Sequence, residues 1–134
     1  MFAAMLFAIS LVALTQFAAY YWRAMLAGAA AQPVSERVLA AAGVQNGQVT
    51  GRDFPALVNL HNLTPELRSG GKGLGLVRAY YSLIDGIASL VGRSLPAVGA
   101  WSERELVVCA RYAAVQIDRR LQANLELAES LRSC

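Results

Sequence analysis

The chain has 134 residues, which is enough for one small domain. Hydrophobic residues make up 56% and charged residues 16%, a balance that excludes a disordered or acidic solvating protein. The net charge is +3, but the basic side chains are single residues mixed with acidic ones, as in Glu36-Arg37 and Glu103-Arg104-Glu105. Because nucleic-acid-binding proteins gather positive charge on one face, we expect no nucleic acid partner.

Residues 2–22 form an uncharged apolar run, and Arg23 is the first charged residue of the chain. As a helix this run would be about 31 Å long, close to the roughly 30 Å of a bilayer's hydrocarbon core. It ends in an aromatic belt followed by a cation that can reach lipid headgroups. We therefore predict one transmembrane helix, surrounded by membrane lipid, whose interface anchors are Tyr20, Tyr21, Trp22 and Arg23.

A cleaved signal peptide is the alternative for this segment, because Ala29-Ala30-Ala31 is similar to a small-residue cleavage site. However, no basic residue precedes the run, and the run exceeds the roughly 7–15 apolar residues of a signal peptide. These features favour a retained, single-pass anchor. Arg23, Arg37 and Arg52 follow the span, so the positive-inside rule predicts that the C-terminal domain is cytoplasmic.

One side of the predicted span carries small and polar residues at helical spacing. Small residues let membrane helices approach closely, and Thr or Gln can hydrogen-bond across such an interface. The alternative is that Ala is simply abundant here, so that the spacing arises by chance. We predict that this face packs against other transmembrane subunits through Ala4, Ala8, Thr15, Gln16 and Ala19.

Residues 32–75 are predicted to be a linker region with short helices. Residues 34–42 have helical composition, and Gly43 is suited to end that helix. Asn46-Gly47 is typical of a tight turn within residues 44–49.

Two further helix starts are expected in the linker region. Asp53 is expected to cap a short helix through Leu60, and Thr64-Pro65-Glu66 is similar to another helix start. The glycine-rich run 69–75 follows no strand and lacks the P-loop spacing around Lys72, so we predict a flexible hinge there.

Residues 76–134 contain two longer amphipathic helices. The first, over 76–95, matches the helical repeat of apolar residues, and its charged residues Arg78, Asp85 and Arg93 argue against a second span. Its apolar positions are Leu76, Val77, Tyr80, Leu83, Ile84, Ile87, Leu90 and Val91. A capping box at Ser102 and Glu105 is expected to start the second helix, which runs to about Arg132. Its apolar face is expected to be Leu106, Ala110, Ala113, Ile117, Leu121, Ala128 and Leu131.

These elements predict an all-α protein with one N-terminal transmembrane helix and a small helical extramembrane domain. The domain is expected to be built on an antiparallel helical hairpin, covered by residues 34–42 or 54–63. The predicted division is residues 1–31 for the span and its interfacial extension, 32–75 for the linker region, and 76–134 for the hairpin.

No constellation of catalytic residues stands out in the sequence. His61 is the only histidine and has no Cys or carboxylate at metal-ligand spacing, so we expect an interface or capping role, and contact with a pigment or haem stays open. Cys109 and Cys134 would lie about 37 Å apart on one continuous helix, beyond disulfide reach, and Cys109 is expected to be a small buried residue. We therefore expect no enzyme, no cofactor and no metal site.

The function these features favour is an accessory or structural subunit that packs against other membrane helices and stabilises a larger membrane protein complex. A self-assembling filament subunit is the alternative, because the first forty or so residues are similar to type IV pilins. In both, an apolar N-terminal helix continues past a proline (here Pro33) into an amphipathic stretch. The chain departs from that family at Met5, where the family usually carries Glu, and it has no visible leader peptidase site or sheet.

Overall fold

The computed structural model describes residues 1–44, 47–64 and 73–134. The elements are α1 (Phe2–Ala30), α2 (Glu36–Ala41), η2 (Gly51–Asp53), α3 (Phe54–Leu63), α4 (Leu74–Val91) and α5 (Pro96–Arg132). All of them are helical, and the described residues contain no strand, so the predicted all-α class is confirmed.

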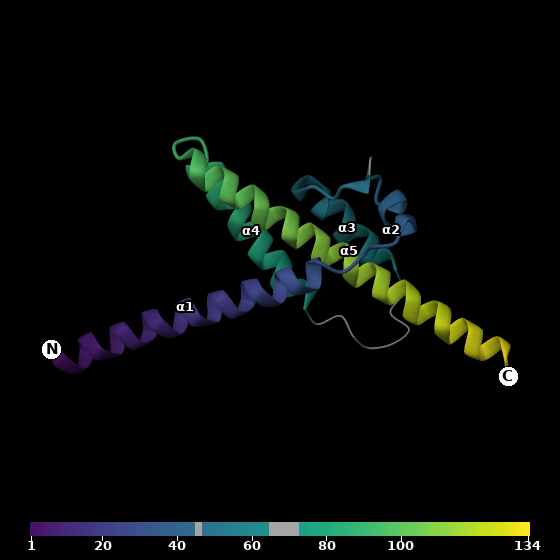
Figure 1. Ribbon diagram of the computed structural model, residues 1–134, viewed down its shortest axis with the longest axis horizontal. Helices are drawn as coiled ribbons and strands as arrows, with labels where there is room; N and C mark the ends of the chain where they lie inside the picture. The colour runs from purple at the N-terminus through teal and green to yellow at the C-terminus, as the bar shows by residue number, and fades with distance from the viewer. Residues whose placement is uncertain (45–46, 65–72) are drawn as a thin grey trace.

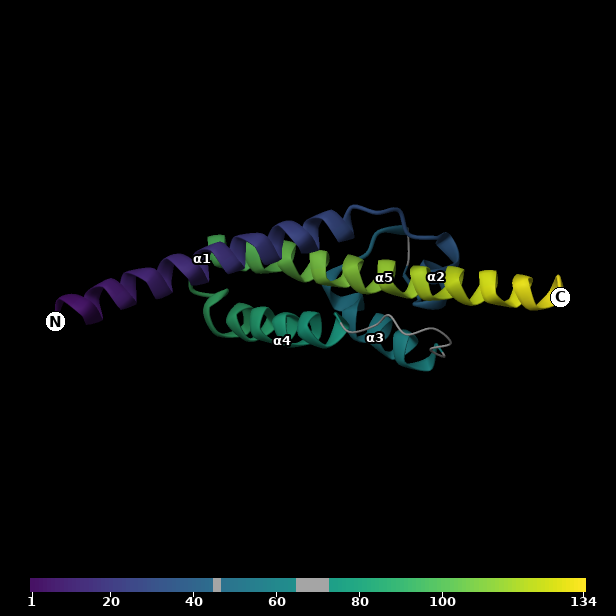
Figure 2. The same ribbon diagram turned by 90° about the horizontal axis from the view of Figure 1, so that it is seen from below.

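Helix α5 is the axis on which the other helices pack (Figure 1). Helix α4 lies along its N-terminal half, and α2 and α3 lie beside its middle. Figure 2 shows α1 on one side of α5 and both α3 and α4 on the other. The two ends of the chain lie at opposite ends of the molecule, because α1 and the last part of α5 both extend beyond the packed helices, which we call the body.

Helix α1 is continuous, but only its last third packs on the body. Every residue from 1 to 21 is exposed, whereas Leu26 and Ala30 are buried. The packed part meets α5, where Arg23 pairs with Glu105 and lies over Trp101. The packed part thus begins where the uncharged run of α1 ends, at Trp22 and Arg23.

The core forms around α5 and draws on each of the helices α1 to α5. Its buried members are Leu26, Val38, Phe54, Leu57, Val58, Leu74, Val77, Cys109, Ala110, Tyr112, Ala113, Ala114 and Ile117. The apolar face predicted for this helix is therefore correct at Ala110, Ala113 and Ile117, and at Leu121, which packs against the core, whereas Leu106 is half-buried. It is wrong at Ala128 and Leu131, which are exposed because α5 has by then passed the body.

The predicted apolar stripe of α4 is wider than the face that becomes buried. Val77 and Ile84 are buried, whereas Leu76, Leu83 and Leu90 are exposed. The three leucines are seven residues apart, so they form one line along the outer side of the helix. Both α1 and α4 are long and apolar enough to cross a membrane by length and composition.

Helix α5 starts earlier than predicted. Pro96 occupies its first turn, and Leu95 before it is extended (φ −129°, ψ 98°), as the residue before a proline prefers. Ser102 is therefore inside the helix, and its hydroxyl donates to the carbonyls of Val98 (2.8 Å) and Gly99 (2.9 Å). The capping box predicted at Ser102 and Glu105 is wrong, because proline supplies the stronger start signal.

The linker region contains two turn motifs that position α2 and α3. Gly43 has φ +73°, and the amide of Val44 donates to the carbonyl of Leu39 (3.0 Å), so the predicted glycine stop is confirmed as a Schellman motif. Asp53 does not bond the start of α3. Its carboxylate instead accepts from the amide and the hydroxyl of Thr50, both at 2.8 Å, and so caps η2.

Three predicted features of the linker region fall on residues that lie outside the described ranges. The first is the Asn46-Gly47 turn, of which Asn46 lies outside those ranges. The second is the helix start at Pro65 and Glu66, and the third is the glycine-rich run, of which residues 69–72 lie outside. Thr64, which was expected to begin a helix, ends α3 instead, and its hydroxyl donates to the carbonyl of Leu60 at 2.8 Å.

Candidate functional site

The residues predicted to pack against other helices all lie on the extended part of α1. Ala4, Ala8, Thr15, Gln16 and Ala19 are exposed. The hydroxyl of Thr15 donates to the carbonyl of Leu11 at 2.7 Å, so this donor is satisfied within its own helix. The predicted packing of this face therefore does not depend on a hydrogen bond from Thr15 to a neighbouring helix.

The four predicted interface anchors separate into two pairs. Tyr20 and Tyr21 are exposed, as an anchor in the headgroup region requires. Trp22 and Arg23 instead contact the body, where they meet side chains of α4 and α5. The sequence did not predict these contacts, and they define the best-organised polar cluster of the described chain. We call it the junction: Trp22, Arg23, Tyr80, Trp101 and Glu105.

The carboxylate of Glu105 is the centre of the junction. Its Oε1 accepts from the Arg23 guanidinium at 2.5 Å, and its Oε2 accepts from the hydroxyl of Tyr80 at 2.9 Å. The Glu105 side chain is 9% exposed and that of Arg23 is 52% exposed. One buried carboxylate on α5 thus binds α1 and α4 together, while the arginine keeps access to the surroundings.

Aromatic rings border this polar cluster. Trp22 meets Tyr80 edge to face, with ring centroids 6.2 Å apart, and Arg23 lies over Trp101 at 5.9 Å from the ring centroid. Burial, the hydrogen bond to Glu105 and the charge of that residue together raise the pKa of Tyr80 to about 12. Tyr80 therefore stays protonated and keeps its role as a donor to Glu105 at neutral pH.

A second aromatic contact attaches α4 to the linker region. Tyr81 stacks on Phe54 with centroids 4.1 Å apart, and its hydroxyl donates to the carbonyl of Gly51 at 2.9 Å. Gly51 lies so close to Leu106 that a Cβ there would be 2.7 Å from the Leu106 Cβ. The adjacent residues Tyr80 and Tyr81 therefore hold the two sides of α4, one at the junction and one at α3.

His61 and the two cysteines do not combine into a reactive site. His61 is buried in α3, and its carbonyl accepts from Arg120 at 3.2 Å. Cys109 is fully buried and Cys134 is exposed, and both are free thiols. Burial and the nearby charge of Glu105 raise the pKa of the Cys109 thiol to about 12. Within the described ranges no group of three His, Cys, Asp or Glu residues is placed to hold a metal ion.

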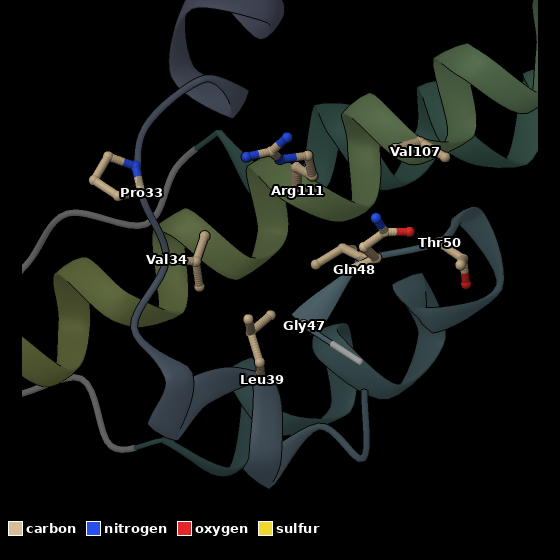
Figure 3. Close-up of a pocket in the computed structure, with 9 residues that line it drawn as sticks. Pro33, Val34, Leu39, Gly47, Gln48, Thr50, Val107 and Arg111 are labelled. Atoms are coloured by element: carbon tan, nitrogen blue, oxygen red, sulfur yellow. The ribbon is translucent and has the colours of Figure 1, made fainter. Parts of the chain in front are cut away.

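A groove of about 610 Å³ lies between residues 33–34, α2 and α5 (Figure 3). Its described lining residues are Pro33, Val34, Leu39, Gly47, Gln48, Val49, Thr50, Val107 and Arg111. Arg111 is the charged residue among them, and the others are aliphatic, amide or hydroxyl side chains or glycine. This lining offers contacts to a bound group, but it does not pair an acid with a base.

Comparison of the chain with protein-family models, with curated proteins and with solved structures finds no match. The candidate site is therefore defined by its own geometry. The sequence pattern assigned Glu105 to a helix cap, and it indicated neither Tyr80 as a partner of Glu105 nor Trp101 as the ring beneath Arg23. One signal was present, since Glu105 shares a helical face with Ser102 and Cys109, and an acid on a buried face usually has a partner.

Proposed function

We propose that the protein is a single-pass membrane accessory subunit. In this proposal α1 crosses the bilayer and packs against helices of other subunits, and the body stabilises a larger membrane protein complex without catalysis or a cofactor. One observation carries the proposal: residues 2–21 are uncharged, helical and exposed along their whole length.

The exposed apolar surface of α1 is the physical reason for a membrane location. Large apolar side chains such as Phe7, Leu14 and Phe17 are all mostly exposed. Covering each of them is worth roughly 1.5–3 kcal/mol, so a run of this kind is strongly driven out of water. Twenty helical residues cover about 30 Å, which matches the thickness of the hydrocarbon core.

The junction supports a fixed attachment of the body at the membrane surface. Helix α1 continues without a break from the exposed run into the body, so no flexible linker separates the two. Arg23 is half exposed while paired with Glu105, so it can also reach lipid headgroups. Tyr20 and Tyr21 then lie at the same level as the start of the body, as the predicted anchor role requires.

The far end of α5 supports contact with a partner outside the membrane. Leu125, Leu127 and Leu131 are exposed on a helix that extends beyond the body. We propose that α4 and α5, packed side by side and joined by residues 92–95, form the antiparallel hairpin of the domain and present this end to the partner. The arginines that follow the span favour a cytoplasmic position for it.

Extraction of native membranes in a mild detergent tests the proposal. The extract is fractionated by size, and the proteins that co-elute are identified by mass spectrometry. Co-elution with several different membrane proteins at a constant ratio is the expected result. A large assembly that contains only this chain would instead support the filament alternative, and a small species that elutes alone would contradict both assemblies.

Substitutions in α1 test the proposed packing face separately from insertion. Ala8→Leu and Thr15→Leu place bulk on that face and are expected to reduce co-elution while the protein remains in the membrane fraction. Ala13→Leu is the matched control, because roughly 140° of helix rotation separates Ala13 from Ala8. If all three variants retain their partners equally, the packing face is assigned wrongly.

A further inference from the structure

A second exposed apolar surface lies where α4 meets α5, and we call residues 90–100 the α4–α5 tip. Leu90, near the end of α4, is 81% exposed, and Leu95, just before α5, is 53% exposed. Arg93 is the only charged residue between Asp85 and Glu103. This surface therefore combines protruding aliphatic side chains with a single cation, which is the composition that suits the edge of a bilayer.

The tip and the exposed run of α1 extend from the same end of the body in both views (Figures 1 and 2). The ion pair between Arg23 and Glu105 and the ring contact between Trp22 and Tyr80 hold α1 against both helices that form the tip. The tip therefore cannot turn away from a bilayer that α1 crosses without breaking the junction.

We propose that the α4–α5 tip inserts into the interfacial layer of the leaflet next to the body, with lipid as its occupant. This inference rests on the proposed membrane span of α1 and adds a second membrane contact to it. Leu90 and Leu95 lie among the upper acyl chains, and Arg93 reaches the phosphates of the same lipids.

The structure also limits how deep this contact goes. Helix α4 carries Arg78 and Asp85, and it buries Val77 and Ile84 against α5. Crossing the bilayer would place both charges in hydrocarbon and separate α4 from its packing partner. The contact is therefore confined to the tip, and α4 is not a second span.

Depth-dependent fluorescence quenching tests the proposal on the full chain. Cys134→Ser removes the exposed thiol, and the buried Cys109, with its raised pKa, stays unlabelled. An environment-sensitive dye is attached to Leu90→Cys, and the purified protein is reconstituted in phosphatidylcholine and phosphatidylglycerol vesicles. The vesicles carry a nitroxide either near the headgroup or near the end of the acyl chain. Two controls carry the same dye, Val12→Cys in the span and Glu126→Cys at the far end of α5.

The expected result is that the headgroup nitroxide quenches the dye at residue 90 about twofold more than the deep one, since interfacial segments lie roughly 5–10 Å into the headgroup and acyl boundary. A dye at Leu95→Cys is expected to behave in the same way, which guards against a local effect of labelling. The dye at residue 126 should be quenched by neither lipid.

Three outcomes would overturn the inference. If residue 90 is quenched no more than residue 126, the tip does not touch lipid, and a second copy that covers the tip would give this same result. If residue 90 is quenched mostly by the deep nitroxide, α4 enters the bilayer core. If residue 12 is not quenched either, the proposed span of α1 fails as well, so the two failures can be told apart.

Discussion

Removing Arg23 is expected to destabilise the protein more than removing the charge of Glu105, although the two residues form one ion pair. The Glu105 side chain is 9% exposed, and in Arg23→Met its carboxylate keeps only the Tyr80 hydroxyl of its two described partners. Loss of a charge-assisted hydrogen bond from a buried group costs about 2–3 kcal/mol. In Glu105→Gln, the side chain still accepts from Tyr80, and Arg23, already 52% exposed, turns to water, so we expect a cost of about 1 kcal/mol.

The two tryptophans of the chain, Trp22 and Trp101, both lie at the junction, so tryptophan emission follows this site directly. Urea titration of the protein in detergent micelles gives the free energy of unfolding for each variant from the linear dependence on denaturant. Arg104→Met is the control, because it removes an exposed arginine that belongs neither to the junction nor to the α4–α5 tip. Equal costs for the two junction variants, or a larger cost for Glu105→Gln, would refute the argument from unequal burial.

Four further substitutions and a pH series test other parts of the fold. The unfolded Cys109 thiol has a pKa of 9.0, but burial raises the folded pKa to about 12. The contribution of this thiol to stability is therefore constant below about pH 8 and falls above pH 9 by up to about 1.4 kcal/mol per pH unit. Urea titrations between about pH 8 and pH 10 measure this slope, and Cys109→Ala should abolish it. Gly51→Ala is expected to cost about 1–3 kcal/mol because the new Cβ would be 2.7 Å from the Leu106 Cβ, and an unchanged denaturation midpoint would show that the turn adapts. Gly86 lies inside α4, and a Cβ added there would meet no neighbouring group within 4 Å. Gly86→Ala should therefore stabilise the protein by up to about 1 kcal/mol in the same assay, because alanine favours the helix more than glycine does. Gly43→Ala places a side chain at φ +73° and should cost about 1–2 kcal/mol, and a neutral effect would contradict the role of this glycine as the stop of α2.

The site was only partly predictable from the sequence. The sequence selected Tyr20, Tyr21, Trp22 and Arg23 because they follow an apolar run as long as the hydrocarbon core is thick. Aromatic and cationic residues at that position are typical of the membrane interface. No spacing rule connects Arg23 to Glu105, which is 82 positions away. Their contact exists because the last third of α1 packs on α5, which is a property of the tertiary structure.

Local chemistry determined the elements of this protein. A repeat of 3.6 residues, the glycine at position 43 and the apolar run at the N-terminus each act within a few residues, so the helical class and the exposed apolar helix follow from the sequence alone. Tertiary structure decided which apolar residues are buried. Leu83 and Ile84 are adjacent on α4 and similarly apolar, yet only Ile84 meets α5, because a helix presents one side to its neighbour. Glu105 was expected in a helix cap, but Pro96 starts α5 earlier and places Glu105 inside the helix. The packing of α1 and α4 on α5 then brings Arg23 and Tyr80 to its carboxylate.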